Sequence, residues 1–336
     1  MKKLRIAING FGRIGRLFYR IALEHPNLEV VAANDLGLTP VLANLLKFDS
    51  VYGKFNHSIS VQNETIQVDQ HSIQFFHERD PVNLPWKNLD IDLVLDATSL
   101  FRKREQLEPH LKAGAKKVLI AVPPKDESIQ QIVLCANKPV YDPKKHDIVS
   151  MASCTTNSAV PLALVLHKEF GIEKGFINTT HAVTMDQSLL DASNKDMRRA
   201  RNSMLNIIPT STGSAKAVGV VIPELKGKLN GVAMRVPISA GSITDLTVKL
   251  SKASTVEEVN QKFKHYAQTS LKGFLEYSEE ELVSSDIVGN SNTCIFDSKQ
   301  TMVIGDLVKV LGWYDNEFGY ASKLADFADY ILEQGF

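Results

Sequence analysis

A glycine-rich turn near the N-terminus constrains the fold of this 336-residue chain more than any other feature. The mostly apolar run 4–8 leads directly into Gly10, Gly12 and Gly15, which are spaced as G-x-G-x-x-G. Residues 15–24 then carry apolar side chains at helical spacing. In such a strand–turn–helix the first glycine permits the tight turn, the second lets a pyrophosphate approach, and the third allows close packing. The helix start favours the anion, so the turn predicts a dinucleotide-binding unit rather than a generic turn.

An acidic residue after the second apolar run, residues 28–33, supports this interpretation. Asp35 lies 20 residues beyond Gly15, where a carboxylate binds a ribose hydroxyl in dinucleotide-binding domains. A carboxylate there repels a 2′-phosphate, so we expect NAD in preference to NADP. The alternative is a turn or helix-capping aspartate, which is common after a strand.

The pattern of apolar residues in the rest of the chain changes at about residue 150. Up to about residue 150, short apolar runs continue at 91–97 and 117–122 between helical segments, which is typical of parallel strands covered on both faces. Further strands are expected at 176–183, 231–237 and 243–250, and helices at 159–170 and 321–334. We therefore expect an α/β fold, with a Rossmann-type doubly wound parallel sheet plus an α+β domain whose sheet is largely antiparallel.

Charge and hydropathy argue against several classes of partner. The 38 Lys+Arg residues balance 38 Asp+Glu residues, so the chain lacks the net charge that typically attracts nucleic acid or an anionic membrane. The longest apolar run spans 159–166, whereas a membrane span needs about 20 residues. No signal peptide is recognisable, and three cysteines are too few for a disulfide framework. We expect a cytoplasmic protein with neither nucleic acid nor membrane as partner.

One of the three cysteines has the local sequence that is typical of a reactive thiol. Cys154 lies in the polar run 153–157, just before an apolar helical segment, and a helix start lowers the pKa of a thiol. Cys135 lies among apolar residues, and nothing marks Cys294 as reactive. His181, near the end of an expected strand, is the candidate base for Cys154. A buried thiol and a structural histidine remain the alternatives.

Arginines and hydroxyls gather further along the chain. Arg198, Arg199 and Arg201 lie together, and residues 209–216 form a hydroxyl-rich turn that ends in a lysine. Arg235 lies within the expected strand 231–237, where a charge is out of place unless it is paired or binds an anion. Arginine can grip phosphate with two parallel hydrogen bonds. We expect a local anion site, with a solvated basic face and a helix cap as the alternatives.

These motifs together resemble the phosphorylating glyceraldehyde-3-phosphate dehydrogenase family. The resemblance covers essentially the whole chain and depends on several long motifs in order. They lie at residues 8–16, 34–36, 153–157, 196–201, 209–213 and 313–317.

The resemblance implies the NAD-dependent phosphorylating oxidation of glyceraldehyde 3-phosphate to 1,3-bisphosphoglycerate, through a thioester on the cysteine, in glycolysis and gluconeogenesis. It implies a homotetramer with an NAD-binding domain at 1–153, a catalytic domain at 154–316, and a C-terminal helix at about 317–336 packed on the former. The catalytic residues would be Cys154 and His181, and no metal is expected. Substrate and inorganic phosphate would be held by Ser153, Thr155, Thr184, Arg199, Thr212, Gly213 and Arg235. NAD would be held by Gly10, Gly12, Arg13, Ile14, Gly15, Asp35, Arg79, Asn316 and Tyr320.

Departures from the family pattern bear on details. Substitutions that could alter rate or substrate choice occur at Ser99, Ala121, Met151, Val183 and Met185. Ala192-Ser193 is similar to members that accept both cofactors, which leaves NADP open as a secondary cofactor.

Two alternative functions remain. One is a related dehydrogenase of another phosphorylated aldehyde, such as erythrose 4-phosphate, against which the retained turn 211–213 argues. The other is a non-catalytic binding protein, against which the retention of Cys154 and His181 argues.

Overall fold

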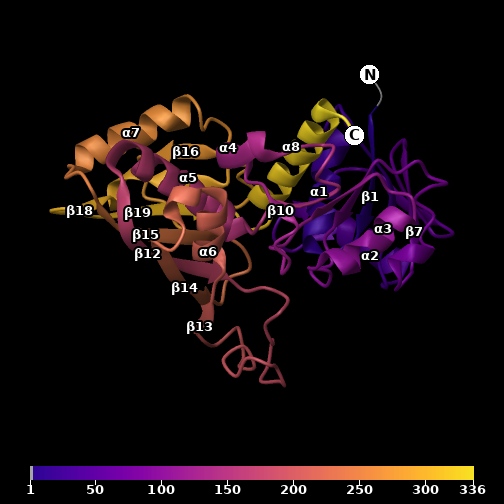
Figure 1. The fold of residues 1–336 in the computed structure, drawn as a ribbon. Coiled ribbons are helices and arrows are strands. Elements are labelled where there is room, and N and C mark those ends of the chain that lie inside the picture. The colour runs from indigo at the N-terminus through magenta and orange to yellow at the C-terminus, as the bar shows by residue number, and fades with distance from the viewer. Residues whose placement is uncertain (1–2) are drawn as a thin grey trace. The chain divides into compact units, whose positions relative to one another are not determined.

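The structure is a computed structural model that describes residues 3–336, and Figure 1 shows its ribbon with many of the helices and strands labelled. The chain divides into two compact units. The first comprises the chain up to Ile132 together with 139–152 and 321–336, and the second comprises 133–138 and 153–320. Within the described residues, no helix is both long and apolar enough to cross a membrane.

The first unit is built on a nine-stranded sheet in the order β10-β11-β9-β8-β1-β2-β7-β6-β5. Neighbours from β10 to β7 run parallel, and β5, β6 and β7 are antiparallel. The strands are β1 (Leu4–Asn9), β2 (Leu28–Asn34), β5 (Ile59–Gln62), β6 (Thr65–Val68), β7 (His71–Phe76), β8 (Leu93–Asp96), β9 (Lys117–Ile120), β10 (Gln130–Gln131) and β11 (Ile148–Ser150). This confirms the expected doubly wound sheet of mainly parallel strands.

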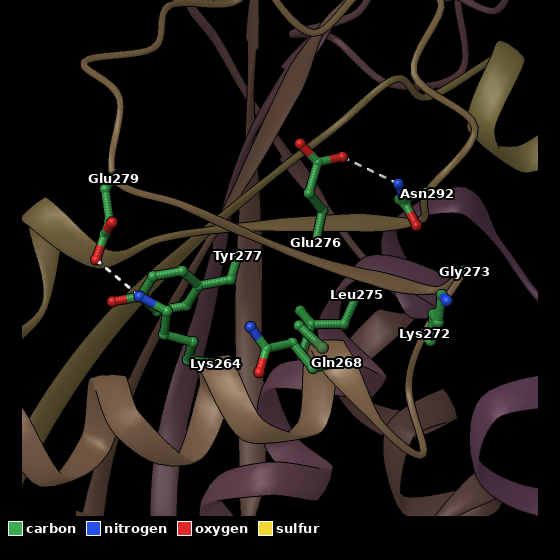
Figure 2. Close-up of a pocket in the computed structure, with 10 residues that line it drawn as sticks. Lys264, Gln268, Lys272, Gly273, Leu275, Glu276, Tyr277, Glu279 and Asn292 are labelled. Carbon is green, nitrogen blue, oxygen red and sulfur yellow. Dashed lines mark hydrogen bonds and ion pairs between the residues drawn. The ribbon is translucent and has the colours of Figure 1, made fainter.

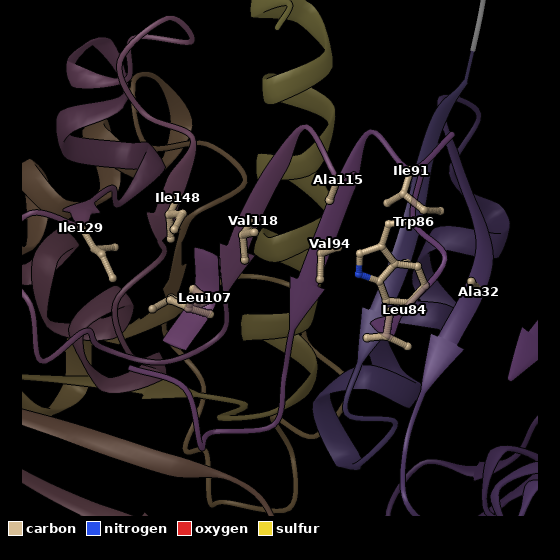
Figure 3. Close-up of a cluster of buried hydrophobic side chains, with 12 residues drawn as sticks. Ala32, Leu84, Trp86, Ile91, Val94, Leu107, Ala115, Val118, Ile129 and Ile148 are labelled. Atoms are coloured by element: carbon tan, nitrogen blue, oxygen red, sulfur yellow. The ribbon is translucent and has the colours of Figure 1, made fainter. Parts of the chain in front are cut away.

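Helices and short elements complete the first unit. They are α1 (Arg13–Glu24), α2 (Thr39–Lys47), the strand pair β3 (Phe48–Asp49) and β4 (Gly53–Lys54), η1 (Pro81–Asn83), α3 (Arg104–Lys112), η2 (Lys138–Val140) and most of α8 (Phe318–Gln334). Helix α1 buries Leu17, Phe18 and Ala22 and ends just before Pro26, which cannot continue a helix. Figure 3 shows the apolar core, in which Trp86, Val94 and Val118 are fully buried.

The second unit is built on a sheet in the order β13-β14-β12-β15-β19-β17-β16, with β18 paired to β19. Its strands are β12 (Ile172–Ala182), β13 (Ile208–Ser211), β14 (Leu229–Val236), β15 (Ser242–Leu250), β16 (Leu275–Ser278), β17 (Cys294–Asp297), β18 (Met302–Ile304) and β19 (Leu307–Tyr314). The pairings are antiparallel except β12–β14 and β16–β17. Its helices are α4 (Leu134–Asn137), α5 (Cys154–Phe170), α6 (Ser214–Val221), η3 (Pro223–Leu225), α7 (Val256–Gln268) and η4 (Ser298–Gln300).

Two sequence expectations can be compared with the structure in this unit. The strand expected at 243–250 is confirmed as β15, in which Leu246, Val248 and Leu250 are buried while the residues between them are partly exposed. The helix expected at 159–170 begins earlier, at Cys154, because the Ser153 side chain caps it by accepting a hydrogen bond from the Thr156 N–H at 3.1 Å.

Candidate active site

Cys154 and His181 are side by side in the second unit. Cys154 is the first residue of α5 and is partly exposed, whereas His181 lies at the end of β12 and is only 4% exposed. The Cys154 Sγ lies 3.5 Å from the His181 Nε2, and His181 Nδ1 lies 2.7 Å from the Ala182 carbonyl oxygen. The His181 Nε2 is the ring nitrogen that faces the thiol. The pair therefore has the geometry of a nucleophile and its base.

The surroundings of the pair set its protonation. Burial raises the pKa of the Cys154 thiol, which corrects the lowering expected from the helix start alone, while the Arg235 charge acts in the opposite direction. Burial and the same arginine lower the pKa of His181 to about 3. His181 is therefore neutral near pH 7 and keeps one unprotonated ring nitrogen. Because the Arg235 charge contributes to the low pKa of His181, an anion that offsets this charge would make His181 a stronger base for the thiol.

Strand register brings Arg235 to the same place. In the parallel pair β12–β14, Arg235 is the partner of His181, and its guanidinium contacts the imidazole Nδ1 and donates to the Ala182 carbonyl at 3.0 Å. Among the described atoms, the buried Nε–H of Arg235 has no hydrogen-bond partner. A charged donor without a partner in a protein interior is costly, so this atom fits an anionic ligand.

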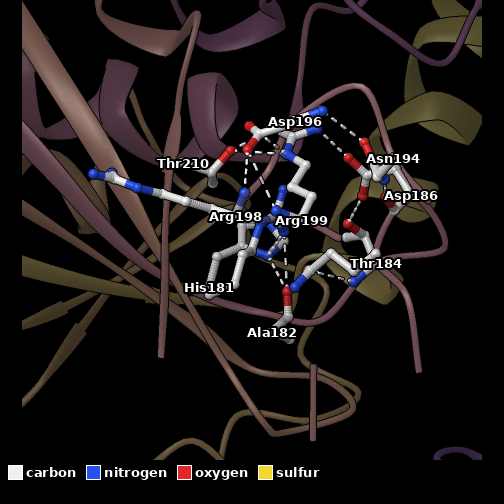
Figure 4. Close-up of polar contacts among 11 residues, drawn as sticks. His181, Ala182, Thr184, Asp186, Asn194, Asp196, Arg198, Arg199 and Thr210 are labelled. Atoms are coloured by element: carbon white, nitrogen blue, oxygen red, sulfur yellow. Dashed lines mark hydrogen bonds and ion pairs between the residues drawn. The ribbon is translucent and has the colours of Figure 1, made fainter. Parts of the chain in front are cut away.

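The loop after β12 brings together more of the expected phosphate ligands (Figure 4). Thr184 Oγ1 and an Arg199 terminal nitrogen both donate to the carboxylate of Asp186. Arg199 also donates from Nε and the other terminal nitrogen to Thr210 Oγ1, at 2.8 and 2.6 Å. Thr184 and Arg199 are thus held together by Asp186, a residue that the sequence patterns did not single out.

The other expected ligands of substrate and phosphate begin helices. Gly213 directly precedes α6, and the Thr212 Oγ1 accepts the Ser214 N–H at 3.2 Å. Thr155, in the first turn of α5, hydrogen-bonds the Tyr314 hydroxyl at 2.8 Å. Helix starts carry N–H groups that stabilise anions, so both positions suit phosphate chemistry.

The glycine turn in the first unit has the geometry of a phosphate cradle. Gly10 has a φ of +91°, and a Cβ there would lie 2.8 Å from the Thr98 nitrogen. A Cβ on Gly15 would lie 2.3 Å from the Gly10 oxygen, whereas one on Gly12 would meet nothing within 4 Å. No side chain caps the start of α1, a role that a bound phosphate can take.

Other expected NAD ligands are placed as follows. Asp35 accepts the N–H groups of Phe11 and Gly37, both at 2.8 Å. Arg13 and Ile14 are the first two residues of α1, and the Arg13 guanidinium forms an ion pair with Asp49 at 2.7 Å. Arg79 is exposed. In the second unit, Asn316 accepts the Ser242 hydroxyl at 3.0 Å, and burial together with the charge of Cys154 raises the pKa of Tyr320.

The departures from the family pattern have different environments. Met151 is fully buried, Ala121 and Val183 are half-buried, and Met185 is 91% exposed beside Thr184. Ser99 has a φ of +62°, a conformation that favours glycine. Nothing in the structure explains how these residues would change rate or substrate choice.

A cavity of about 380 Å³ lies elsewhere in the second unit, between α7 and the region of β16 (Figure 2). Its lining includes Lys264, Tyr277 and Glu276 but none of the expected site residues. Within residues 3–336, no group of three or more His, Cys, Asp or Glu side chains is placed to hold a metal ion.

Comparisons with known proteins agree with the geometry. Residues 4–104 match the family model described as "Glyceraldehyde 3-phosphate dehydrogenase, NAD binding domain", and residues 153–316 match the corresponding C-terminal domain. The chain is 50% identical over 333 residues to glyceraldehyde-3-phosphate dehydrogenase 2 of Streptomyces avermitilis, covering 98% of this chain and 99% of that protein. It is 51% identical to glyceraldehyde-3-phosphate dehydrogenase of Geobacillus stearothermophilus, covering 99% of each.

Proposed function

The chain belongs to the glyceraldehyde-3-phosphate dehydrogenase family, and from this premise we propose that Cys154 and His181 perform the NAD-dependent phosphorylating oxidation of glyceraldehyde 3-phosphate. The protein is an NAD-dependent oxidoreductase with small-molecule substrates. The observation that carries the proposed residue roles is the 3.5 Å approach of the Cys154 Sγ to the His181 Nε2 at the start of α5. A thiol and a neutral imidazole at this distance can exchange a proton directly.

The first half-reaction oxidises the aldehyde. His181 Nε2 takes the proton of the Cys154 thiol, the thiolate adds to the aldehyde carbon, and the resulting oxyanion takes that proton from His181 to give a hemithioacetal. The Cys154 backbone N–H and His181 stabilise the oxyanion. His181, with Nε2 again free, then takes the hydroxyl proton as the C–H electron pair departs as hydride, which leaves a thioester on Cys154.

The second half-reaction transfers the acyl group. Inorganic phosphate attacks the thioester carbon, the C–S bond breaks, and the Cys154 thiolate leaves as 1,3-bisphosphoglycerate forms. Arg235 supplies its buried Nε–H to the phosphates, and Arg199 and Thr184 supply donors in exchange for part of their bonding to Asp186. The thioester retains energy of oxidation that hydrolysis would dissipate.

The residues of the first unit fit NAD. The open space at Gly12 and the uncapped start of α1 suit the pyrophosphate, and Asp35 suits a ribose hydroxyl. NAD supplies the hydride acceptor when bound. We further propose that Arg13, Arg79, Asn316 and Tyr320 contribute to holding it.

Assembly and location extend the proposal. Exposed apolar side chains are concentrated in the loop after β12, with Met185, Leu190, Met197 and Leu205 all at least 69% exposed. Phe176 on β12 is also 69% exposed. Such surfaces support a homotetramer, which we propose to be cytoplasmic, with residues 1–153 binding NAD, 154–316 carrying out the chemistry, and the helix at about 317–336 packed on the former.

NADH formation by the purified protein tests the function. We expect turnover of glyceraldehyde 3-phosphate to require inorganic phosphate, and kcat/KM to be at least about tenfold higher with NAD than with NADP, because Asp35 disfavours a 2′-phosphate. Erythrose 4-phosphate serves as the comparison substrate. Faster turnover of erythrose 4-phosphate would replace the proposed substrate, and activity on neither aldehyde would reject the enzymatic function.

The Arg235→Gln variant tests the electrostatics of the thiol. Because the Arg235 charge lowers the pKa of Cys154, removing it raises that pKa and reduces the thiolate fraction at neutral pH. We expect iodoacetamide to inactivate the variant about tenfold more slowly at pH 7, with the rate recovering as the pH rises. The exposed Arg198→Gln variant is the matched control. Identical pH curves for Arg235→Gln and the wild type would contradict this role.

A further inference from the structure

Three buried polar side chains lie along one edge of the sheet in the first unit. The strands β8, β1, β2 and β7 are neighbours in that order and run parallel, so their carboxyl ends share an edge. Asp96 ends β8, Asn9 ends β1 and Asn34 ends β2. All three side chains are buried, with exposed fractions of 0%, 2% and 5%.

These side chains form a continuous series of hydrogen bonds. The Asn9 Nδ2 donates to the Asp96 Oδ2 at 2.7 Å, and the Asn34 Nδ2 donates to the Asn9 Oδ1 at 2.8 Å. Asn34 also donates to the Glu78 carbonyl at 2.9 Å and accepts the Glu78 N–H at 2.8 Å. At the other end, the Asp96 Oδ1 accepts the N–H and the hydroxyl of Thr98, at 3.2 and 2.7 Å.

Asp96 is the point on which this series depends. The Trp86 indole N–H donates to the His110 Nδ1 at 3.1 Å, and the His110 Nε2 lies 3.3 Å from the Asn9 Nδ2. That Nε2 lies 3.6 Å from the Asp96 Oδ2. A fully buried carboxylate is costly unless donors surround it, and here donors approach both oxygens. An amide in its place would present a donor to one side.

Both ends of the series reach the elements proposed to bind NAD. Thr98 packs against the glycine turn, since a Cβ on Gly10 would lie 2.8 Å from its nitrogen. The Gly10 N–H donates to the Asn34 carbonyl at 2.8 Å, and Asn34 directly precedes the ribose-binding candidate Asp35. Glu78 directly precedes Arg79. The buried series therefore links the glycine turn to the segments that carry the acidic and basic ligands.

We propose that Asp96 is a positioning residue for NAD, acting through Thr98 and Asn9 to hold this edge of the sheet in the form that binds the cofactor. The proposal rests on the proposed function, because it takes NAD as the ligand. With the Asp96 carboxylate present, its hydrogen bonds order this edge of the sheet before NAD binds. Without the carboxylate, part of the binding free energy of NAD must be spent on ordering the edge, so the affinity for NAD is lower.

The test uses isothermal titration of the full-length protein with NAD. The Asp96→Asn variant places an amide donor against the Asn9 donor, and we expect its Kd for NAD to rise about tenfold. The milder Thr98→Val variant removes one hydroxyl donor and is expected to raise the Kd about threefold. The Ser72→Ala variant, which loses a hydroxyl hydrogen bond to Gln67 at the other end of β7, should bind like the wild type.

Two further readouts separate positioning from general destabilisation. The kcat at saturating NAD and the rate of Cys154 alkylation without NAD should both remain within about twofold of the wild type, because neither depends on affinity for NAD. An unchanged Kd in Asp96→Asn, even with a lower melting temperature, overturns the proposal. If Asp96→Asn does not fold, an unchanged Kd in Thr98→Val overturns it. A wild-type protein that fails to bind NAD would instead reject the proposed function itself, and this inference with it.

Discussion

Replacing Cys154 by serine is expected to lower the rate of NAD reduction by about 10⁴-fold or more, because a hydroxyl is a far weaker nucleophile than a thiolate. The substitution exchanges only the sulfur for an oxygen, and the Ser153 side chain that caps the start of α5 is unaffected. NAD affinity should remain within about twofold of the wild type, because the NAD contacts that we propose are made by other residues. The measurement is steady-state NADH formation with glyceraldehyde 3-phosphate, together with a titration of NAD.

The Cys135→Ser variant is the matched control for this experiment, because it removes a second partly exposed thiol from the same unit. It should retain nearly full activity. If Cys154→Ser instead turned over at close to the wild-type rate, Cys154 would not be the nucleophile, and the thioester mechanism would have to be abandoned.

The second large effect is expected at His181. The His181→Asn variant keeps an amide near the position of Nδ1, where it can donate to the Ala182 carbonyl, but it has no group to replace the Nε2 base. Loss of a general base typically costs 10²–10⁴-fold in rate. We expect a fall of about 10³-fold in the formation of NADH in a single turnover, measured by stopped-flow absorbance at saturating NAD.

The exposed His265→Gln variant on α7 controls for the loss of a histidine from the same unit. Alkylation of Cys154 at neutral pH should also be slower in His181→Asn, because the buried thiol would have lost its proton acceptor. A variant with normal single-turnover kinetics would show that another group, or water, acts as the base.

Local sequence patterns predicted much of the fold. The glycine turn and the apolar runs around it predicted the parallel sheet, because residues covered on both faces leave a strong signal. Apolar periodicity placed the start of α5 too late, since its first turn is polar and begins at a serine cap. The parallel pairing of β12 with β14 could not be predicted, because it joins strands separated by a long loop and another strand, β13.

The candidate site was harder to predict than the fold. Motifs suggested Cys154 and His181 as a pair, and the structure shows their distance, while their roles remain predictions. Asp186 gave no signal, because an exposed aspartate in a loop is ordinary until Thr184 and Arg199 are seen to donate to it. The role of Asp96 could not be predicted from the sequence either. A lone acidic residue in an apolar run can be recognised as the centre of a hydrogen-bond network only once the neighbouring strands are known.

The pairing of His181 with Arg235 across β12 and β14 has a consequence for how this protein tolerates change in length. Side chains alternate between the two faces of a strand, so one residue inserted within β14 before Arg235 would turn the guanidinium to the opposite face. The length of the chain between the two strands does not affect this alignment, because the register is set within the strands themselves. Insertions and deletions should therefore be eliminated from β12 and β14, where a single added residue would inactivate the enzyme without removing any catalytic side chain. Between the strands they should be restricted to positions away from Thr184, Asp186 and Arg199, which are held by hydrogen bonds.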